Sequence, residues 1–208
     1  MTRGFFIVFE GGDGAGKTTH AAALADHLER VGWRVRRTFE PGDTAMGASV
    51  RQIVLTTTTP LAPRTEALLY AADKAQHVAE VVRPALEAGE IVVCDRYVDS
   101  TIAYQGAGRA LDPDDIARLG WWAVGGLKPD LTVLLDVSVA DGLDGKDTLD
   151  RMEAAGTDFH ERVRGHFLAL AAADPARYLV VAGRGPMAET TAAIRAAVEA
   201  RLAGPVHR

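Results

Sequence analysis

The stretch that decides the fold of this chain is Gly11-Gly12-Asp13-Gly14-Ala15-Gly16-Lys17-Thr18. It matches G-x-x-x-x-G-K-[ST], the Walker A phosphate-binding loop. Residues 5–9, directly before it, are a continuous apolar run, typical of a strand buried on both faces. After the loop, apolar residues recur at helical spacing up to Val31, and Gly32 is suited to end that helix. Strand, loop and helix therefore follow one another in the order that the motif needs.

These eight residues predict an ATP-binding site. Glycines allow backbone N–H groups to turn inward on a phosphate, and the N-terminus of the following helix adds partial positive charge there. We expect Lys17 to reach the outer phosphates and Thr18 to offer its hydroxyl to Mg²⁺. A glycine-rich turn without a ligand is the alternative, and the flanking strand and helix argue against it.

Composition limits the possible classes of protein. The 208 residues predict one domain over 1–208, and a hydrophobic fraction of 48% is enough for a sizeable core. A net charge of −5 does not favour nucleic acid as a partner. Cys94 is the only cysteine, which excludes an intrachain disulfide and fits a reducing compartment. No apolar run approaches the ~20 residues of a membrane span, so we expect a cytoplasmic protein without a membrane partner.

Strand-like and helix-like segments alternate along the chain, which predicts an α/β fold with a mostly parallel sheet. Further strands are expected at 35–39, 91–94, 131–135 and 178–181. Helices are expected at 65–87, from an N-cap at Asp112 onward, at 158–173 and at 187–202. The histidines outside these patterns lack metal-ligand spacing and receive no role: His20, His27, His160, His166 and His207.

The helix at 65–87 has two distinct faces. An apolar stripe predicted to face the core consists of Leu68, Ala72, Ala75, Ala79, Val82 and Leu86. The opposite face carries Tyr70, Asp73, Lys74 and His77. An aromatic ring and a cation together can hold a nucleobase, although such a face taken alone is more typical of a solvated surface.

Polar side chains follow two of the expected strands. Asp95 and Arg96 come directly after the strand at 91–94, where ligands bind in open parallel sheets. A carboxylate there can hold Mg²⁺, and a guanidinium can clamp a phosphate; a surface ion pair is the alternative. Two further groups have ordinary turn chemistry as their alternative: Ser100, Thr101, Tyr104 and Gln105, and the tight turn Glu40-Pro41-Gly42.

The segment 138–152 becomes acidic and rich in glycine. Its spacing does not fit a calcium loop. A mobile lid over the site and a plain exposed loop are equally compatible with its composition.

Taken together, these segments resemble the thymidylate kinase family, whose members phosphorylate dTMP with ATP. The resemblance runs from Phe6 to about Ala171 and is carried by FEGGDGAGKTT (9–19), EPG (40–42), EALLYAADKAQH (66–77), DRY (95–97), AYQG (103–106), DRME (150–153) and FHERVR (159–164). The DRY and AYQG pair is far more specific than the phosphate loop. The resemblance implies the P-loop nucleoside monophosphate kinase fold, a five-stranded parallel sheet flanked by helices, with ATP as co-substrate, Mg²⁺ as cofactor and a homodimer.

The resemblance also implies roles for individual residues. Asp13 is expected near the sugar 3′-hydroxyl, Tyr70 stacked on thymine, and Tyr104 against the sugar 2′ position. The implied catalytic residues are Lys17, Asp13, Asp95 and Arg96, and the implied Mg²⁺ ligands are Thr18 and Asp95. The implied dTMP-binding residues are Asp13, Glu40, Pro41, Arg51, Tyr70, Lys74, Arg96, Ser100, Thr101, Tyr104 and Gln105.

Three positions depart from the family pattern. Phe39 stands where arginine is frequent, and Lys74 stands where an arginine commonly bonds the thymine carbonyl. A lysine keeps the charge and loses the planar fork, which predicts softer base selectivity. The lid is poor in arginine and offers Lys146 and Arg151 to stabilise charge during transfer. A kinase for another pyrimidine monophosphate and a slowly hydrolysing P-loop regulator remain as alternatives.

Overall fold

The computed structural model describes residues 3–143, 151–183 and 185–203. Its centre is a sheet in the order β2-β3-β1-β4-β5, in which every neighbouring pair is parallel. The strands are β1 (Phe5–Gly11), β2 (Val35–Phe39), β3 (Ile91–Asp95), β4 (Leu131–Asp136) and β5 (Tyr178–Ala182). The predicted five-stranded parallel sheet is therefore confirmed, and the apolar run before the phosphate loop is its fully buried central strand.

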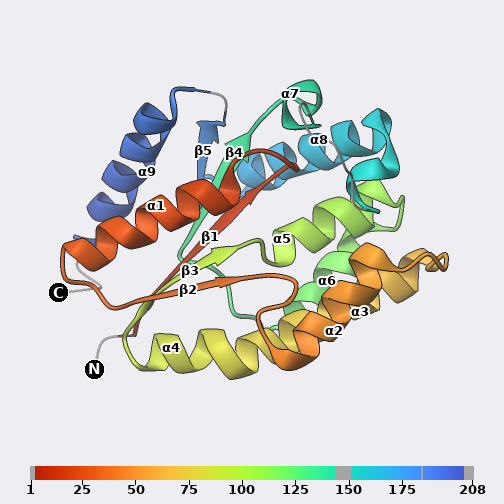
Figure 1. Cartoon of the computed structure of the whole chain (residues 1–208), viewed down its shortest axis with the longest axis horizontal. Coiled ribbons are helices and arrows are strands. Elements are labelled where there is room, and N and C mark those ends of the chain that lie inside the picture. Colours follow the sequence, from red (N-terminus) through yellow and green to blue (C-terminus); the bar gives the residue numbers. More distant parts are fainter. Residues whose placement is uncertain (1–2, 144–150, 184, 204–208) are drawn as a thin grey trace.

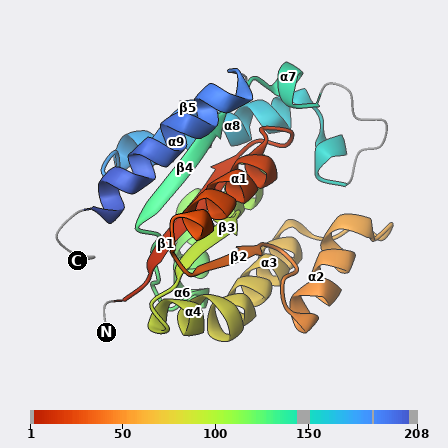
Figure 2. The same cartoon turned by 60° about the vertical axis from the view of Figure 1, so that its left-hand side comes forward.

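Helices cover both faces of this sheet (Figures 1 and 2). Because successive side chains of a strand point to opposite faces, Phe5, Ile7 and Phe9 of β1 pack with α1 (Lys17–Arg30) and α9 (Met187–Leu202). Phe6 and Val8 point the other way, into a second core. The helical segments whose buried residues form this second core are α3 (Pro63–His77), the π-helical η1 (Val78–Val82), α4 (Arg83–Glu87), α5 (Val98–Thr101), the π-helical η2 (Ile102–Gly108) and α6 (Pro113–Ala123).

The remaining helical segments are α2 (Ala45–Thr56), α7 (Val139–Leu143), η3 (Glu153–Ala155) and α8 (Thr157–Ala173). Helix α2 packs beside α3 (Figure 2), and the hydroxyl of Thr44 caps it by accepting from the backbone N–H of Gly47 at 2.9 Å. The predicted N-cap at Asp112 is confirmed, because its carboxylate accepts from the N–H groups of Asp114 and Asp115. Among the described helices, none is long and apolar enough to cross a bilayer.

The predicted helix at 65–87 is present as α3, η1 and α4, but the assignment of its faces was wrong. Leu68 is 57% exposed, and Ala72 and Ala79 are also exposed, whereas Val82 and Leu86 are buried as expected. The polar face, Tyr70, Asp73, Lys74 and His77, is buried instead. Charges can be buried when they are paired. Here the carboxylate of Glu40, in the turn directly after β2, supplies the partner, and hydrophobic periodicity cannot reveal it.

Candidate active site

The carboxyl ends of β1, β2 and β3 open into one cavity of about 730 Å³. Most of the residues predicted for ATP, acceptor or metal line it. They are Asp13, Gly14, Gly16, Lys17, Thr18, Glu40, Pro41, Arg51, Tyr70, Lys74, Asp95, Arg96, Ser100, Thr101, Tyr104 and Gln105. The sequence thus predicted the lining of a single site from segments almost 100 residues apart.

The phosphate loop is held at one end of this cavity. Gly16 adopts the left-handed conformation, with φ of 85°, directly before α1. A Cβ on Gly14 would lie 1.7 Å from the carbonyl oxygen of Gly142 in α7, so glycine is required for this close approach. The backbones of the loop and of the beginning of the predicted lid are therefore closely packed.

Lys17 lies buried beneath the loop. Its ammonium donates to the carbonyl oxygens of Gly11, at 3.0 Å, and Gly12, at 2.6 Å. Burial, with a smaller contribution from the positive charge of Arg96, lowers the pKa of Lys17 to about 8. The amine is still mostly cationic at pH 7 and can neutralise a phosphate that enters the loop.

Two side-chain oxygens that could bind a metal ion lie close together where β3 ends beside α1. The hydroxyl of Thr18 donates to the Asp95 carboxylate at 2.5 Å. Mg²⁺ prefers oxygen ligands, and in phosphate-binding sites it is held by one or two carboxylates and hydroxyls together with the phosphates themselves. The oxygens of Thr18 and Asp95 are therefore of the type and in the place that a Mg²⁺ site needs.

Arg96 and Asp13 form the centre of the cavity wall. The Arg96 guanidinium donates to the Asp13 carboxylate, to Ser100 Oγ at 3.1 Å and to the carbonyl oxygen of Gly11 at 3.4 Å. The Tyr104 hydroxyl donates to the other Asp13 oxygen at 2.8 Å. Although burial acts in the opposite direction, the charges of Arg96 and Lys17 lower the pKa of Asp13. Asp13 is thus held as an anion in a fixed orientation.

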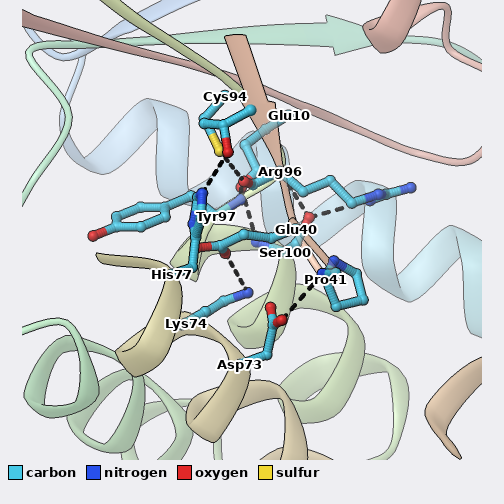
Figure 3. A network of polar contacts seen from close by, with 12 residues as sticks. Glu10, Glu40, Pro41, Asp73, Lys74, His77, Cys94, Arg96, Tyr97 and Ser100 are labelled. Atoms are coloured by element: carbon cyan, nitrogen blue, oxygen red, sulfur yellow. Dashed lines mark hydrogen bonds and ion pairs between the residues drawn. The ribbon is translucent and has the colours of Figure 1, made fainter. Parts of the chain in front are cut away.

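A buried ionic cluster joins Glu40, which follows β2, to α3, and both Glu40 and Lys74 also line the cavity (Figure 3). The two carboxylate oxygens of Glu40 lie 2.7 Å from Lys74 Nζ and 2.7 Å from His77 Nδ1. Lys74 Nζ is 5.9 Å from the centre of the Tyr70 ring. Burial acts against both charges, yet Lys74 lowers the pKa of Glu40, and Glu40 raises the pKa of Lys74. The amine predicted to read the base is therefore already paired with a carboxylate.

Three other predicted acceptor residues differ in how their polar groups are used. The Thr101 hydroxyl is buried and has no hydrogen-bond partner among the described residues. Gln105 donates to Glu66 at 2.9 Å. Arg51 donates to the carbonyl oxygen of Pro41 at 2.7 Å and lies 5.7 Å from the centre of the Phe39 ring. Gln105 and Arg51 therefore already use polar atoms in contacts within the protein.

The structure describes the predicted lid in part. Lys146 lies outside the described residues. The Arg151 guanidinium pairs with Glu66 of α3 and donates to the carbonyl oxygen of Val54 in α2 at 2.9 Å. Arg151 is not among the residues that line the cavity, although Met152 and Glu153, which follow it, are.

Comparison with known sequences supports the identification that this geometry indicates. A sequence profile described as thymidylate kinase matches residues 9–194. The chain belongs to the thymidylate kinase family. It is 57% identical over 200 residues to a protein of Cutibacterium acnes named thymidylate kinase, covering 96% of this chain and 98% of that one.

Other thymidylate kinase relatives match over a similar length. A thymidylate kinase of Leifsonia xyli subsp. xyli is 52% identical over 203 residues, covering 96% of each chain. One from a Synechococcus strain is 47% identical over 197 residues, covering 95% of each. The all-parallel sheet and its helices agree with the P-loop kinase fold of this family.

Sequence reasoning overlooked two residues of this thymidylate kinase site. Glu10 is fully buried beside Arg96, and the signal that could have found it is a lone acid at the end of an apolar strand. His160 is buried, donates through Nε2 to the Glu153 carbonyl oxygen at 3.0 Å, and places Nδ1 3.9 Å from the Asp13 carboxylate. His160 belongs to the FHERVR motif at 159–164, but that motif does not reveal its contact with Asp13, which lies in a distant segment.

Proposed function

We propose that this protein transfers the γ-phosphoryl group of ATP to dTMP, giving dTDP and ADP. The observation that carries this proposal is one cavity lined both by the phosphate-loop residues Lys17 and Thr18 and by Tyr70 of α3. A nucleotide-binding switch needs no such second pocket. Family membership and the names of the relatives support the same reaction.

Phosphoryl transfer mainly requires that the two substrates are positioned and that the charge on their phosphates is neutralised. The second pKa of a phosphate monoester is about 6, so the acceptor is largely a dianion near pH 7 and needs no strong base. Lys17 and Arg96 supply fixed positive charge, and Arg51 is the further cation for the acceptor phosphate. Thr18 and Asp95 would hold Mg²⁺, which neutralises charge on the phosphates when bound.

The proposal includes a lid formed by residues 138–152, from which Lys146 or Arg151 would stabilise charge during transfer. For Arg151 to act on the transferred group, its guanidinium would have to leave Glu66. Glu66 would then keep Arg109, 3.2 Å away, as its partner. A second cation on Glu66 thus lowers the cost of releasing the first.

A panel of nucleoside monophosphates tests the acceptor assignment. We expect kcat/KM to be highest for dTMP, lower for dUMP and lowest for UMP. A missing methyl group alters kcat/KM by about 10–200-fold in a shaped pocket, which sets the expected range for dUMP. A coupled assay of ADP release gives these ratios.

Each alternative has its own outcome in that assay. Equal kcat/KM values for dTMP, dUMP and UMP would indicate a general pyrimidine monophosphate kinase. ADP release that is independent of any added monophosphate would indicate the slowly hydrolysing regulator.

We also propose a cytoplasmic homodimer. Trp122 on α6 is 80% exposed and Leu68 on α3 is 57% exposed, and these two helices pack together. Large apolar side chains that are exposed on two helices packed together are suited to a protein interface. The buried free thiol of Cys94 supports a reducing compartment.

Replacing Trp122 with Glu is expected to convert the dimer to a monomer, because a charge at an apolar contact must be desolvated without a partner. Sedimentation velocity measures the change. The matched control is Met187→Glu on α9, an exposed apolar residue on the other face of the sheet, which should leave the dimer intact. A wild-type protein that is monomeric at micromolar concentration would contradict the proposal.

A further inference from the structure

Glu10 is a buried acid that the reaction scheme above does not use. It lies at the end of β1, immediately before the phosphate loop, and is 0% exposed. Its Oε1 accepts from the backbone N–H groups of Tyr97, at 2.8 Å, and Ser100, at 3.1 Å. Its Oε2 accepts from the Ser100 hydroxyl at 2.6 Å (Figure 3). Three donors therefore converge on one carboxylate beneath the site.

The backbone that Glu10 holds is in an unusual conformation. Arg96 has φ of 70°, in the left-handed region that side chains other than glycine rarely adopt. Such a conformation persists only when its surroundings determine it. The Arg96 N–H donates to the Phe9 carbonyl oxygen at 2.9 Å, and the next N–H, that of Tyr97, donates to Glu10. Residues of β1 thus bind the backbone N–H groups of both Arg96 and the residue that follows it.

The same carboxylate also determines how the Arg96 side chain is oriented. Arg96 donates to Ser100 Oγ at 3.1 Å, so the Ser100 proton is free to point at Glu10. While Glu10 is ionised the direction is unambiguous, because a guanidinium only donates and an ionised carboxylate only accepts. The chain of contacts then continues from Arg96 to Asp13. Glu10 therefore lies at the base of the network that orients both cavity residues.

We infer that Glu10 is a positioning residue for the acceptor phosphate: it aims the Arg96 guanidinium through Ser100 and holds the strained Arg96 backbone. This inference rests on the proposed dTMP kinase activity. It assigns Glu10 no contact with either substrate. Glu10 acts by setting the position of the Arg96 guanidinium before the acceptor phosphate binds.

The ionisation of Glu10 gives the network a pH dependence. Burial, with Asp99 adding to it, raises the pKa of Glu10 to about 7. The charged or titratable groups of neighbouring elements that interact electrostatically with Glu10 are Asp99, Arg96, Lys17, Lys74, Cys94 and Tyr178. As the pH falls through this value, a proton on Oε2 turns an acceptor into a donor, and the Ser100 proton loses its partner. Binding of the acceptor dTMP should therefore weaken as the pH falls.

The test compares Glu10→Gln, Ser100→Ala and the double variant. Glutamine has the same shape, and its oxygen can still accept from both backbone N–H groups, while its amide replaces the acceptor for Ser100. We expect each single variant to lower kcat/KM for dTMP about 10-fold, mainly through KM for dTMP, with KM for ATP little changed. The double variant should lose no more kcat/KM than either single variant, because both substitutions break the same chain of hydrogen bonds from Glu10 through Ser100 to Arg96.

Asp99→Asn is the matched control. Asp99 is another buried acid on α5, next to Ser100, and its carboxylate pairs with Arg177 and Tyr178 instead. It should lower Tm without raising KM for dTMP. Ser100→Thr keeps a hydroxyl and should restore most of the activity that Ser100→Ala loses.

Three results would overturn the inference. One is a KM for dTMP in Glu10→Gln equal to that of the wild type. Another is a double variant whose loss equals the product of the two single losses. The third is a pH dependence of KM for dTMP that is the same in Glu10→Gln as in the wild type, because the acceptor's own ionisation is common to both. Failure of the wild type to phosphorylate dTMP would instead overturn the proposed function.

Discussion

Replacing Lys17 with Ala is expected to lower kcat by at least about 10²–10³-fold while the fold persists. Preorganised positive charge at a water-excluded site is worth that much for each donor removed. Lys17 is the cation inside the loop, and burial already holds it against the backbone carbonyl oxygens of Gly11 and Gly12. The coupled ADP assay measures kcat, and circular dichroism during heating measures the fold.

The matched control for this variant is Lys128→Ala. Lys128 is exposed, and its ammonium lies 5.6 Å from the centre of the Trp121 ring, away from the cavity residues. It should leave kcat unchanged. Near-normal kcat in Lys17→Ala would refute the role assigned to Lys17, because no other side chain of the described phosphate loop carries positive charge.

Replacing Glu40 with Ala is expected to lower the free energy of unfolding by about 3–5 kcal/mol, because removing one partner of a buried ion pair leaves the other charge uncompensated. The Lys74 side chain is only 2% exposed and has the Glu40 carboxylate 2.7 Å from its ammonium. For a chain of this size, such a loss corresponds to a fall in Tm of roughly 6–20 °C. Urea titration and calorimetry measure the two quantities.

Two comparisons show whether the buried charge is the cause. Adding Lys74→Met to Glu40→Ala should recover most of the stability, since a buried pair replaced by apolar groups is often neutral. Asp115→Ala, which removes the exposed ion pair with Arg118, should have no measurable effect. A double variant as unstable as Glu40→Ala alone would contradict this account.

The same pair predicts a pH dependence of stability. Lys74 lowers the pKa of Glu40 below its usual value of 4.5, so the carboxylate is favoured in the folded state. Its contribution to stability is therefore present above that value and is lost as the pH falls through the folded-state pKa. Acid unfolding of Glu40→Ala should lack this component.

Much of the fold could be predicted because its signals are local. A strand buried on both faces requires a continuous apolar run, and the phosphate loop requires glycines at fixed offsets before Lys17 and Thr18. The position of Asp95 and Arg96 at a strand end could be predicted for the same reason, since all parallel strands end at one edge of the sheet. Each inference needs only residues that are close together in the chain.

The face of α3 could not be predicted by this route. Periodicity assigns Leu68 to the core and Lys74 to solvent, and the structure reverses both. The reversal depends on Glu40, 34 residues earlier, which arrives on the end of β2 and pairs with Lys74 and His77. Once its charge is matched, a polar face can be buried, and the small apolar face is left outside.

The sequence by itself determined the parallel sheet, the phosphate loop and most of the side chains that line the cavity, because apolar runs and glycine spacing act over a few neighbouring residues. Only the tertiary structure decided which charges are paired: Lys74 with Glu40, Arg151 with Glu66, and Arg96 with Asp13 above the buried Glu10. The physical reason is that an ion pair depends on the distance between atoms in space, and these partners are brought together only when the strands assemble.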